Sequence, residues 1–193
     1  SVWDEYHIDQ EINDRDVALD VFFGTDYHSH LGTRRGGMVL FDKKEGFQRQ
    51  IHNIENTPFR TKFERDLADF RGHAGLGCIS DSDPQPLLVR SHLGLYAIVT
   101  VGIINNTDEL VKAYLSNKGQ QFLTLSSGRV NVTELTAALI NQENDLVSGI
   151  LHAMEVIDGS MTILILTEEG ELIAARDSMG RLPVLIGQRE DGY

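Results

Sequence analysis

Apolar side chains recur along this chain at spacings that distinguish predicted helices from predicted strands. Over residues 17–27 they return every three to five positions, which is typical of one face of a helix. Further amphipathic helices are predicted over residues 61–70, 106–115, 132–140 and 146–157. Short apolar runs bounded by Gly, Pro, Asp or Ser predict strands over residues 38–41, 47–52, 74–79, 87–89, 93–104, 161–167, 171–176 and 183–187.

The predicted strands and helices come in blocks rather than in strict alternation. This order favours an α+β fold with mainly antiparallel sheets over a doubly wound parallel sheet. No proline-rich run marks an internal boundary, so residues 17–193 are predicted to form one domain. Residues 1–16 are rich in Asp and Glu with only scattered apolar residues, which predicts an acidic leader that can stay disordered.

Composition narrows the classes of partner. Seventeen basic and 29 acidic side chains give a formal charge of −12, which repels nucleic-acid phosphates and anionic membrane surfaces. We therefore expect neither a nucleic acid nor a membrane as partner. The single cysteine, Cys78, excludes an internal disulfide, and no run approaches the ~20 apolar residues that cross a bilayer. A cytoplasmic location is expected.

The C-terminal part of the chain carries the most specific motif. A predicted strand follows Asp-Gly-Ser at residues 158–160, and residues 174–183 then read Ala-Ala-Arg-Asp-Ser-Met-Gly-Arg-Leu-Pro. This order resembles the Gly-Ser strand, Ala-Arg-Asp-x-x-Gly turn and following proline strand of class II glutamine amidotransferases. Asp177 and Gly180 are expected to form a tight turn that Arg176 braces, which is a structural rather than a ligand-binding role.

Four other segments match the same family in the same order. They read Ser-His-Leu-Gly at 29–32, Gly-His-Ala-Gly-Leu-Gly-Cys at 72–78, Asp-Pro-Gln-Pro at 83–86 and Thr-Val-Gly-Ile-Ile-Asn-Asn at 100–106. They resemble the family's Gln-His-Arg-Gly, Gly-His-x-Arg-Tyr-Ser-Thr, Asn-x-Gln-Pro and His-Asn-Gly-x-x-x-Asn segments. The residues assigned to this structural motif are His30, Gly32, His73, Gln85, Pro86, Arg176, Asp177 and Gly180.

The resemblance extends from about residue 17 to residue 187 and is to the amidophosphoribosyltransferase type of this family. It implies a four-layer αββα sandwich of two mainly antiparallel sheets between helices, the fold of N-terminal-nucleophile hydrolases. In that family an N-terminal cysteine attacks the glutamine amide, and its free amine acts as the base. This chain begins with Ser1, which is a candidate nucleophile only if it is the mature N-terminus. A first residue is more often a remnant of processing, and no other catalytic residue is assigned.

Five residues mark where the family's substrate pocket would lie. Val101 replaces the asparagine that supplies oxyanion donors together with the glycine amide matched by Gly102. Gly75 replaces the arginine that holds the substrate carboxylate, which removes a bidentate clamp. Val132 lies near the position of the aspartate that would hold the substrate ammonium, and Asn106 matches the last asparagine of the fourth segment.

Cys78 and two histidines could each be functional or structural. The apolar neighbours of Cys78 predict a buried, inert thiol rather than a nucleophile. His28 and His30 would share one face of a strand, but no partner ligands can be placed beside them. We interpret both as solvated loop residues and expect neither a metal site nor a cofactor.

Three functions stay open. The first is a degenerate glutaminase domain with a structural or regulatory role beside a phosphoribosyltransferase domain or subunit, which this chain does not include. The second is a working amidotransferase with a relocated or processed nucleophile. The third is a sensor for glutamine or another small ligand that reuses the pocket, and in each case a homo-oligomer is expected. The likeness is stronger in scaffold turns than in site residues, which favours the first.

Overall fold

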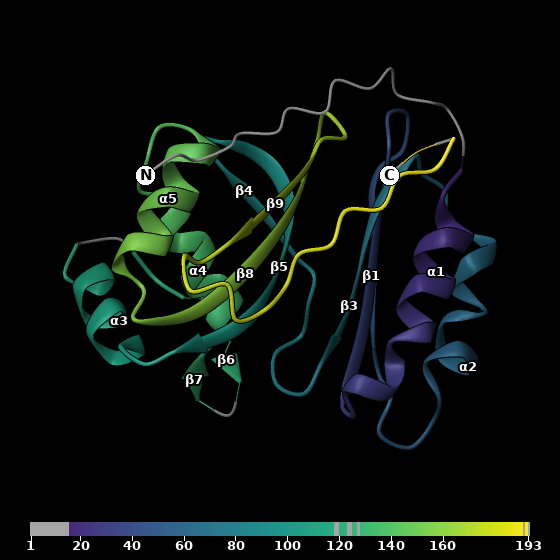
Figure 1. The fold of residues 1–193 in the computed structure, drawn as a ribbon, viewed down its shortest axis with the longest axis horizontal. Coiled ribbons are helices and arrows are strands. Elements are labelled where there is room, and N and C mark those ends of the chain that lie inside the picture. The colour runs from purple at the N-terminus through teal and green to yellow at the C-terminus, as the bar shows by residue number, and fades with distance from the viewer. Residues whose placement is uncertain (1–15, 118–119, 123–124, 127, 191, 193) are drawn as a thin grey trace.

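Four layers make up the protein, in the order helices, sheet, sheet, helices (Figure 1). The computed structural model describes residues 16–117, 120–122, 125–126, 128–190 and 192. Helices α1 (Ala18–Tyr27) and α2 (Phe59–Phe63) form one outer layer. Helices α3 (Thr107–Leu115), α4 (Val132–Ile140) and α5 (Leu146–Val156) form the other. The predicted α+β sandwich is confirmed.

The first sheet contains three antiparallel strands in the order β2-β1-β3. Its members are β1 (Arg35–Asp42), β2 (Gly46–Asn53) and β3 (Ala74–Ser80). β1 is central and covered on both faces, so Val39 and Leu40 are fully buried although their side chains point in opposite directions. β2 is an edge strand. The 3-10 turns η1 (Ser29–Leu31) and η2 (Asp66–Ala68) lie in the connections around this sheet.

The second sheet contains four antiparallel strands in the order β4-β5-β8-β9. Its members are β4 (Leu87–Ser91), β5 (Gly94–Ile104), β8 (Gly159–Thr167) and β9 (Leu172–Arg176). Pairing between β4 and β5 ends at Leu87 and Ile98, so the last residues of β5 have no β4 partner. The short strands β6 (Leu125–Ser126) and β7 (Arg129–Val130) form a separate pair.

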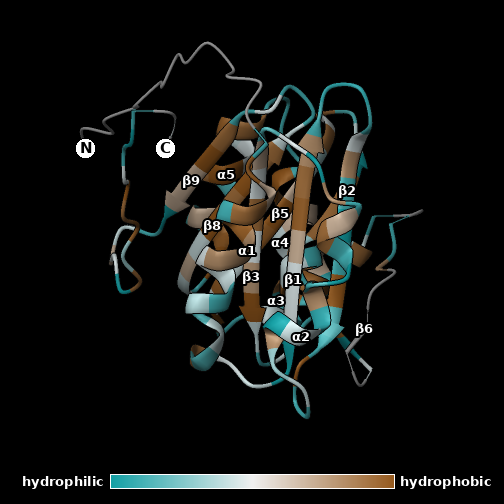
Figure 2. Cartoon of the chain, turned by 90° about the vertical axis from the view of Figure 1, so that its right-hand side faces the viewer, coloured by the Kyte–Doolittle hydropathy of each residue, from teal (hydrophilic) through white to brown (hydrophobic). Residues whose placement is uncertain are grey.

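Apolar side chains fill the three interfaces between the layers. In Figure 2 the strands are largely brown, whereas many of the connecting loops are teal. The space between the sheets is filled by Val39, Phe41, Ala74, Leu76, Cys78, Ala97, Val99 and Leu166. The interface of α1 and α2 with the first sheet contains Ala18, Phe22, Met38, Leu40, Phe59, Phe63 and Phe70. A third cluster, centred on Tyr96, Ile98, Leu135, Ile140, Met161 and Ile165, joins α4 and α5 to the second sheet.

Two predicted elements are wrong. Residues 61–70 do not form one helix but the end of α2 followed by η2, because apolar spacings of three and four residues suit 3-10 turns as well as an α-helix. Stacking of Phe59 on Phe63, with ring centroids 4.2 Å apart, fixes α2 two residues earlier than predicted. Residues 183–187 form no strand, since Leu185 is 90% exposed and pairs with no strand of the described chain. The predicted leader, apart from Asp16, lies outside the described residues.

Candidate functional site

A buried glutamine ties β5 to the segment that crosses from the first sheet to the second. The Gln85 Nε2 donates to the Thr100 carbonyl oxygen at 3.1 Å, and the Thr100 N–H donates to Gln85 Oε1 at 2.7 Å. These bonds continue the β5 ladder beyond the end of β4. On the first sheet, a Cβ added to Gly37 would lie 1.7 Å from the Gln85 carbonyl oxygen, so only glycine lets this segment approach.

Helix α4 begins beside the same stretch of β5. The side chain of Asn131 caps the helix, and the Val132 N–H donates to Asp83 Oδ2 at 3.0 Å. Asp83 is buried, and its bond to the Val132 N–H places its carboxylate at the positive end of the helix. The hydroxyl groups of Thr133 and Thr100 are hydrogen-bonded at 2.7 Å. The crossing segment therefore fixes strand and helix relative to each other.

The backbone N–H of Gly102 lies on the side of β5 that β4 leaves uncovered. Asp177 bonds both backbone groups of Met161, through its carboxylate at 2.8 Å and its own N–H at 2.9 Å. Met161 pairs with Gly102 across the β5–β8 ladder, and antiparallel residues alternate their backbone groups between the two neighbours. The Gly102 N–H therefore points away from β8. On this side of β5 it is the next N–H after that of Thr100, which donates to Gln85.

The exposed end of the interface between the two sheets, marked by Val101 and Ile103 on β5, is called the mouth between the sheets. Val101 places an apolar side chain there. It shares a strand face with Ala97 and Val99, which pack between the sheets, but it is 51% exposed. Ile103, next on the same face, is 68% exposed. The Val101 side chain therefore offers no hydrogen-bond donor beside Gly102. The backbone N–H of Gly102 is the donor at this point of β5.

Gly75 faces helix α1 rather than the space between the sheets. A Cβ at this position would lie 2.8 Å from the Val21 side chain and 3.0 Å from the Val39 carbonyl oxygen. A long basic side chain would not fit there unless α1 moved. The position matched to the family's arginine thus lies on the opposite face of the first sheet from Val101 and Gly102.

Asn106 also lies apart from the mouth between the sheets. Its Nδ2 donates to the Val156 carbonyl oxygen at 2.9 Å, and its Oδ1 accepts from the Asp158 N–H at 3.0 Å. These bonds join the start of α3 to the connection between α5 and β8. Of the predicted pocket residues, Val101 and Gly102 are adjacent on β5, and Val132 lies at the start of α4, where it packs against the cluster between the helices and the second sheet. Gly75 and Asn106 lie elsewhere.

The predicted turn after β9 is confirmed. Asp177 Oδ1 accepts from the Met179 and Gly180 N–H groups at 2.9 and 3.1 Å. The Met161 N–H, and then those of Gly180 and Met179, hold the pKa of Asp177 below its ordinary value. Gly180 has a φ of +59°, and a Cβ there would lie 2.7 Å from the Arg176 guanidinium. The Arg176 guanidinium therefore lies close to Gly180, and its bracing role stays a prediction.

The histidines of the loop after α1 are exposed. The Nδ1 atoms of His28 and His30 are hydrogen-bonded to the carbonyl oxygens of Gly24 and Tyr27, at 2.8 and 3.0 Å. Gly32, two residues later, lies against the end of β3, where a Cβ would overlap another side chain. Within the described ranges, no group of three or more His, Cys, Asp or Glu side chains is placed to hold a metal ion.

His73 and Pro86 make contacts at different places along the first sheet. The His73 ring meets Phe41 edge-on with centroids 5.5 Å apart, and its Nε2 is buried without a hydrogen-bond partner in the described structure. The Pro86 carbonyl oxygen accepts from Arg49 at 3.0 Å. Both residues therefore contribute to packing around the sheet.

Cys78 is a buried thiol of the sheet–sheet interface, as predicted. It is 8% exposed, and burial raises its pKa to about 12. A thiol with such a pKa carries almost no thiolate at neutral pH, so it is a poor nucleophile. Ser1 lies outside the described residues, and its role as a nucleophile stays a prediction.

Sequence reasoning missed the roles of Asp83, Thr100 and Thr133. Thr133 lies 33 residues from Thr100, and Val132 lies 49 residues from Asp83, so no local spacing relates them. The available signal was that Asp83 and Thr100 each begin a segment matched to the family. No helix in the described part of the chain is long and apolar enough to span a membrane.

Two antiparallel sheets packed between helical layers, with a glycine amide at the mouth between them, define a domain of the N-terminal-nucleophile hydrolase architecture. Residues 74–193, more than half of the chain, match the model of the glutamine amidotransferase domain family. The chain belongs to this family, within the class II glutamine amidotransferases.

Curated relatives and solved structures agree with this assignment. The amidophosphoribosyltransferase of Archaeoglobus fulgidus is 25% identical over 192 residues, covering 97% of this chain and 40% of the relative. That of Methanocaldococcus jannaschii is 27% identical over 184 residues, covering 90% and 37%. The structure of glutamine phosphoribosylpyrophosphate amidotransferase from B. subtilis, complexed with ADP and GMP, has a TM-score of 0.70 at 26% identity, covering 83% of this chain and 34% of that chain. The chain thus spans about two fifths of the length of its curated relatives.

Proposed function

We propose that this chain is the glutamine amidotransferase domain of an amidophosphoribosyltransferase-like protein in which glutamine hydrolysis is lost or strongly impaired. Its remaining role is then structural or regulatory. The observation that carries this proposal is the apolar Val101 side chain beside the Gly102 amide at the mouth between the sheets. Removal of one oxyanion donor typically slows acyl transfer by about a hundredfold or more.

Two further residues support the loss of activity. β3, the strand matched to the one that carries the substrate-binding arginine, contains no arginine, and Gly75 on it faces α1, so this strand offers no guanidinium to the mouth between the sheets. Cys78 is buried with a pKa of about 12, which argues against a relocated cysteine nucleophile. Both observations count against the alternative of a working amidotransferase.

The relatives suggest the setting in which this domain acts. They are amidophosphoribosyltransferases more than twice as long as the part that matches, and one related solved structure is described as the allosteric regulatory enzyme of purine biosynthesis. We therefore propose a phosphoribosyltransferase domain or subunit as partner, in a cytoplasmic homo-oligomer.

Light scattering on the purified protein measures the oligomeric state, and a monomer at all concentrations would contradict the proposed homo-oligomer.

The proposal is tested by measuring ammonia release from glutamine. The purified protein is expected to release none above a buffer control, whereas the B. subtilis relative serves as positive control in the same assay. A glutamine-mimicking electrophile, with mass spectrometry to locate any adduct, provides a second measurement. Turnover at a rate comparable to the relative, or a stoichiometric adduct on this chain, would refute the proposal.

A further inference from the structure

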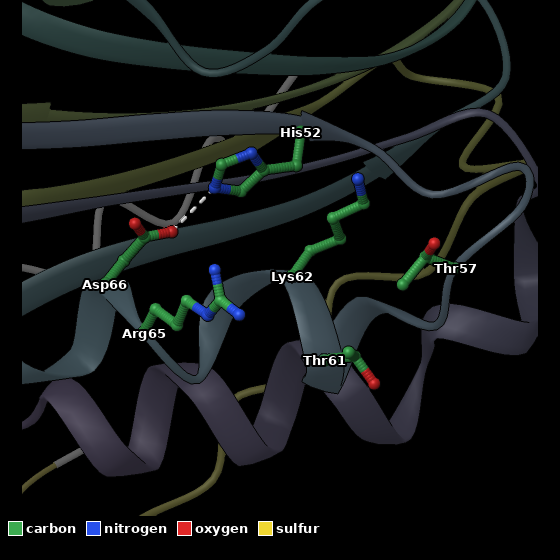
Figure 3. Close-up of a pocket in the computed structure, with 6 residues that line it drawn as sticks. All are labelled: His52, Thr57, Thr61, Lys62, Arg65 and Asp66. Atoms are coloured by element: carbon green, nitrogen blue, oxygen red, sulfur yellow. Dashed lines mark hydrogen bonds and ion pairs between the residues drawn. The ribbon is translucent and has the colours of Figure 1, made fainter.

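An open cavity of about 360 Å³ lies on the helical side of the first sheet. It is lined by His52, Thr57, Thr61, Lys62, Arg65 and Asp66 (Figure 3). His52 comes from the edge strand β2, and the other lining residues come from α2, η2 and the chain beside them. Small-molecule sites usually measure about 300–1,000 Å³, so the size suits a small ligand.

His52 is fixed in this cavity on two sides. Its Nε2 lies 2.6 Å from Asp66 Oδ2, and its ring meets Phe63 edge-on with centroids 4.7 Å apart. Phe63 is fully buried, so His52 packs against a ring that the core holds in place. Asp66 is the one acidic residue of the six in the lining, and its carboxylate is hydrogen-bonded to His52.

Lys62 and Arg65 bring positive charge to the cavity, and neither forms an ion pair within the described structure. Figure 3 shows both side chains reaching from the helical segment toward the strand that carries His52. Nearby Arg60 behaves differently, because it is bound to Asp26 at 2.7 Å. Lys62 and Arg65 thus share one cavity, and the carboxylate of Asp66 beside them is hydrogen-bonded to His52.

This set of groups matches the chemistry of a phosphate group. A guanidinium donates in a fixed fork, an ammonium supplies a compact charge, and the Thr57 hydroxyl can add a neutral donor. The two cations disfavour a metal ion. We propose that this cavity binds the phosphate group of a small phosphorylated metabolite, held mainly by Lys62 and Arg65.

The site is independent of the proposed loss of glutaminase activity. His52 packs with Phe63 on the face of the first sheet covered by α1 and α2, whereas Val101 lies at the mouth between the sheets. The measurement therefore needs no glutamine. Phosphate binding and glutamine hydrolysis can be present or absent separately.

A titration of the 15N-labelled full chain with glycerol 2-phosphate tests the proposal, with ionic strength held constant by NaCl. Saturable shifts are expected for the amides of residues 52–66. Glycerol should cause none, and acetate should bind at least about tenfold more weakly. Both anions can face the guanidinium fork with two oxygens, but a phosphate has about twice the charge and a third oxygen that can accept from Lys62. Shifts that do not saturate, or equal binding of acetate, would overturn the phosphate assignment.

A pair of double variants distinguishes a built site from general charge attraction. Lys62→Ala with Arg65→Ala should weaken phosphate binding by about tenfold or more, since charge-assisted hydrogen bonds are lost. Lys43→Ala with Lys44→Ala removes the same charge from the exposed turn between β1 and β2 and should change binding by less than about twofold. Both pairs are exposed, so both variants should keep the fold. Equal weakening in the two variants would refute the site.

Discussion

The side chain of Gln85 bonds both the N–H and the carbonyl oxygen of Thr100, at 2.7 and 3.1 Å. Both residues are buried. An amide side chain thus takes the place of a neighbouring strand two residues beyond Ile98, where β4 ends its pairing with β5.

Replacement of Gln85 by alanine should destabilise the fold. Two backbone groups of Thr100 would be left buried without partners, and each such group costs about 1–3 kcal/mol, so we expect a loss of about 2–6 kcal/mol. Guanidinium denaturation measures the change. Gln50→Ala, an exposed glutamine of β2, should stay within about 0.5 kcal/mol of the native value. A similar stability for both variants would contradict the role of Gln85.

Gly102 and Val101 should respond very differently to alanine. A Cβ on Gly102 would lie 2.0 Å from the Ser160 carbonyl oxygen, so β5 and β8 would have to separate. We expect Gly102→Ala to cost about 2 kcal/mol or more, as overpacking does. Val101→Ala, at a half-exposed position, should cost less than about 1 kcal/mol. Urea denaturation of the two variants tests this contrast, and equal losses would argue against the close backbone approach.

Asp177 should stabilise the turn after β9 in a pH-dependent way. Backbone donors, led by the Met161 N–H, lower the pKa of its carboxyl in the folded state, whereas an unfolded aspartate has a pKa of about 3.9. The charged form therefore stabilises the fold above about pH 4, and this contribution is lost as the pH falls through the folded pKa. The stability difference between the native protein and Asp177→Asn should be constant from about pH 5 to 8 and shrink in acid.

The matched control for this titration is Ser178→Ala, an exposed neighbour in the same turn. Its stability difference from the native protein should not change with pH. Thermal unfolding followed at several pH values provides the data. An Asp177→Asn difference that persists unchanged into strong acid would show that the carboxylate is not the stabilising group.

Cys78 should be unreactive while the protein is folded. Burial raises the pKa of its thiol to about 12, so iodoacetamide at pH 8 should label it only through unfolding. In denaturing guanidinium the same thiol should react within minutes. Rapid labelling of the native protein would show an accessible thiolate and would revive the relocated nucleophile.

Elements whose contacts are local could be predicted from the sequence. Helix α4 has the predicted bounds because Leu135, Leu139 and Ile140 recur at helical spacing and face the core. Residues 183–187 are equally apolar, but a strand also needs a neighbour, and no local pattern reveals whether one exists. The helix predicted over residues 61–70 failed for a related reason, since its spacing does not distinguish an α-helix from successive 3-10 turns.

The site divides in the same way. The turn at Asp177 could be predicted because its carboxylate bonds Met179 and Gly180, two and three residues away. The contacts of Thr100 with Gln85 and Thr133 span 15 and 33 residues and follow only from the packing of the layers. His52 and Asp66, 14 residues apart, belong to no motif, so the cavity they line had no signal in the sequence.

Alternation along β5 separates positions that the fold requires from a position that it does not. The side chain at position 101 projects into solvent and adds little to folding, while its neighbours at 100 and 102 are held by buried bonds and backbone contact. Mutational drift can therefore remove chemistry from position 101 without lowering the yield of folded protein. A scaffold of this kind can outlive its catalytic activity and remain available for another role.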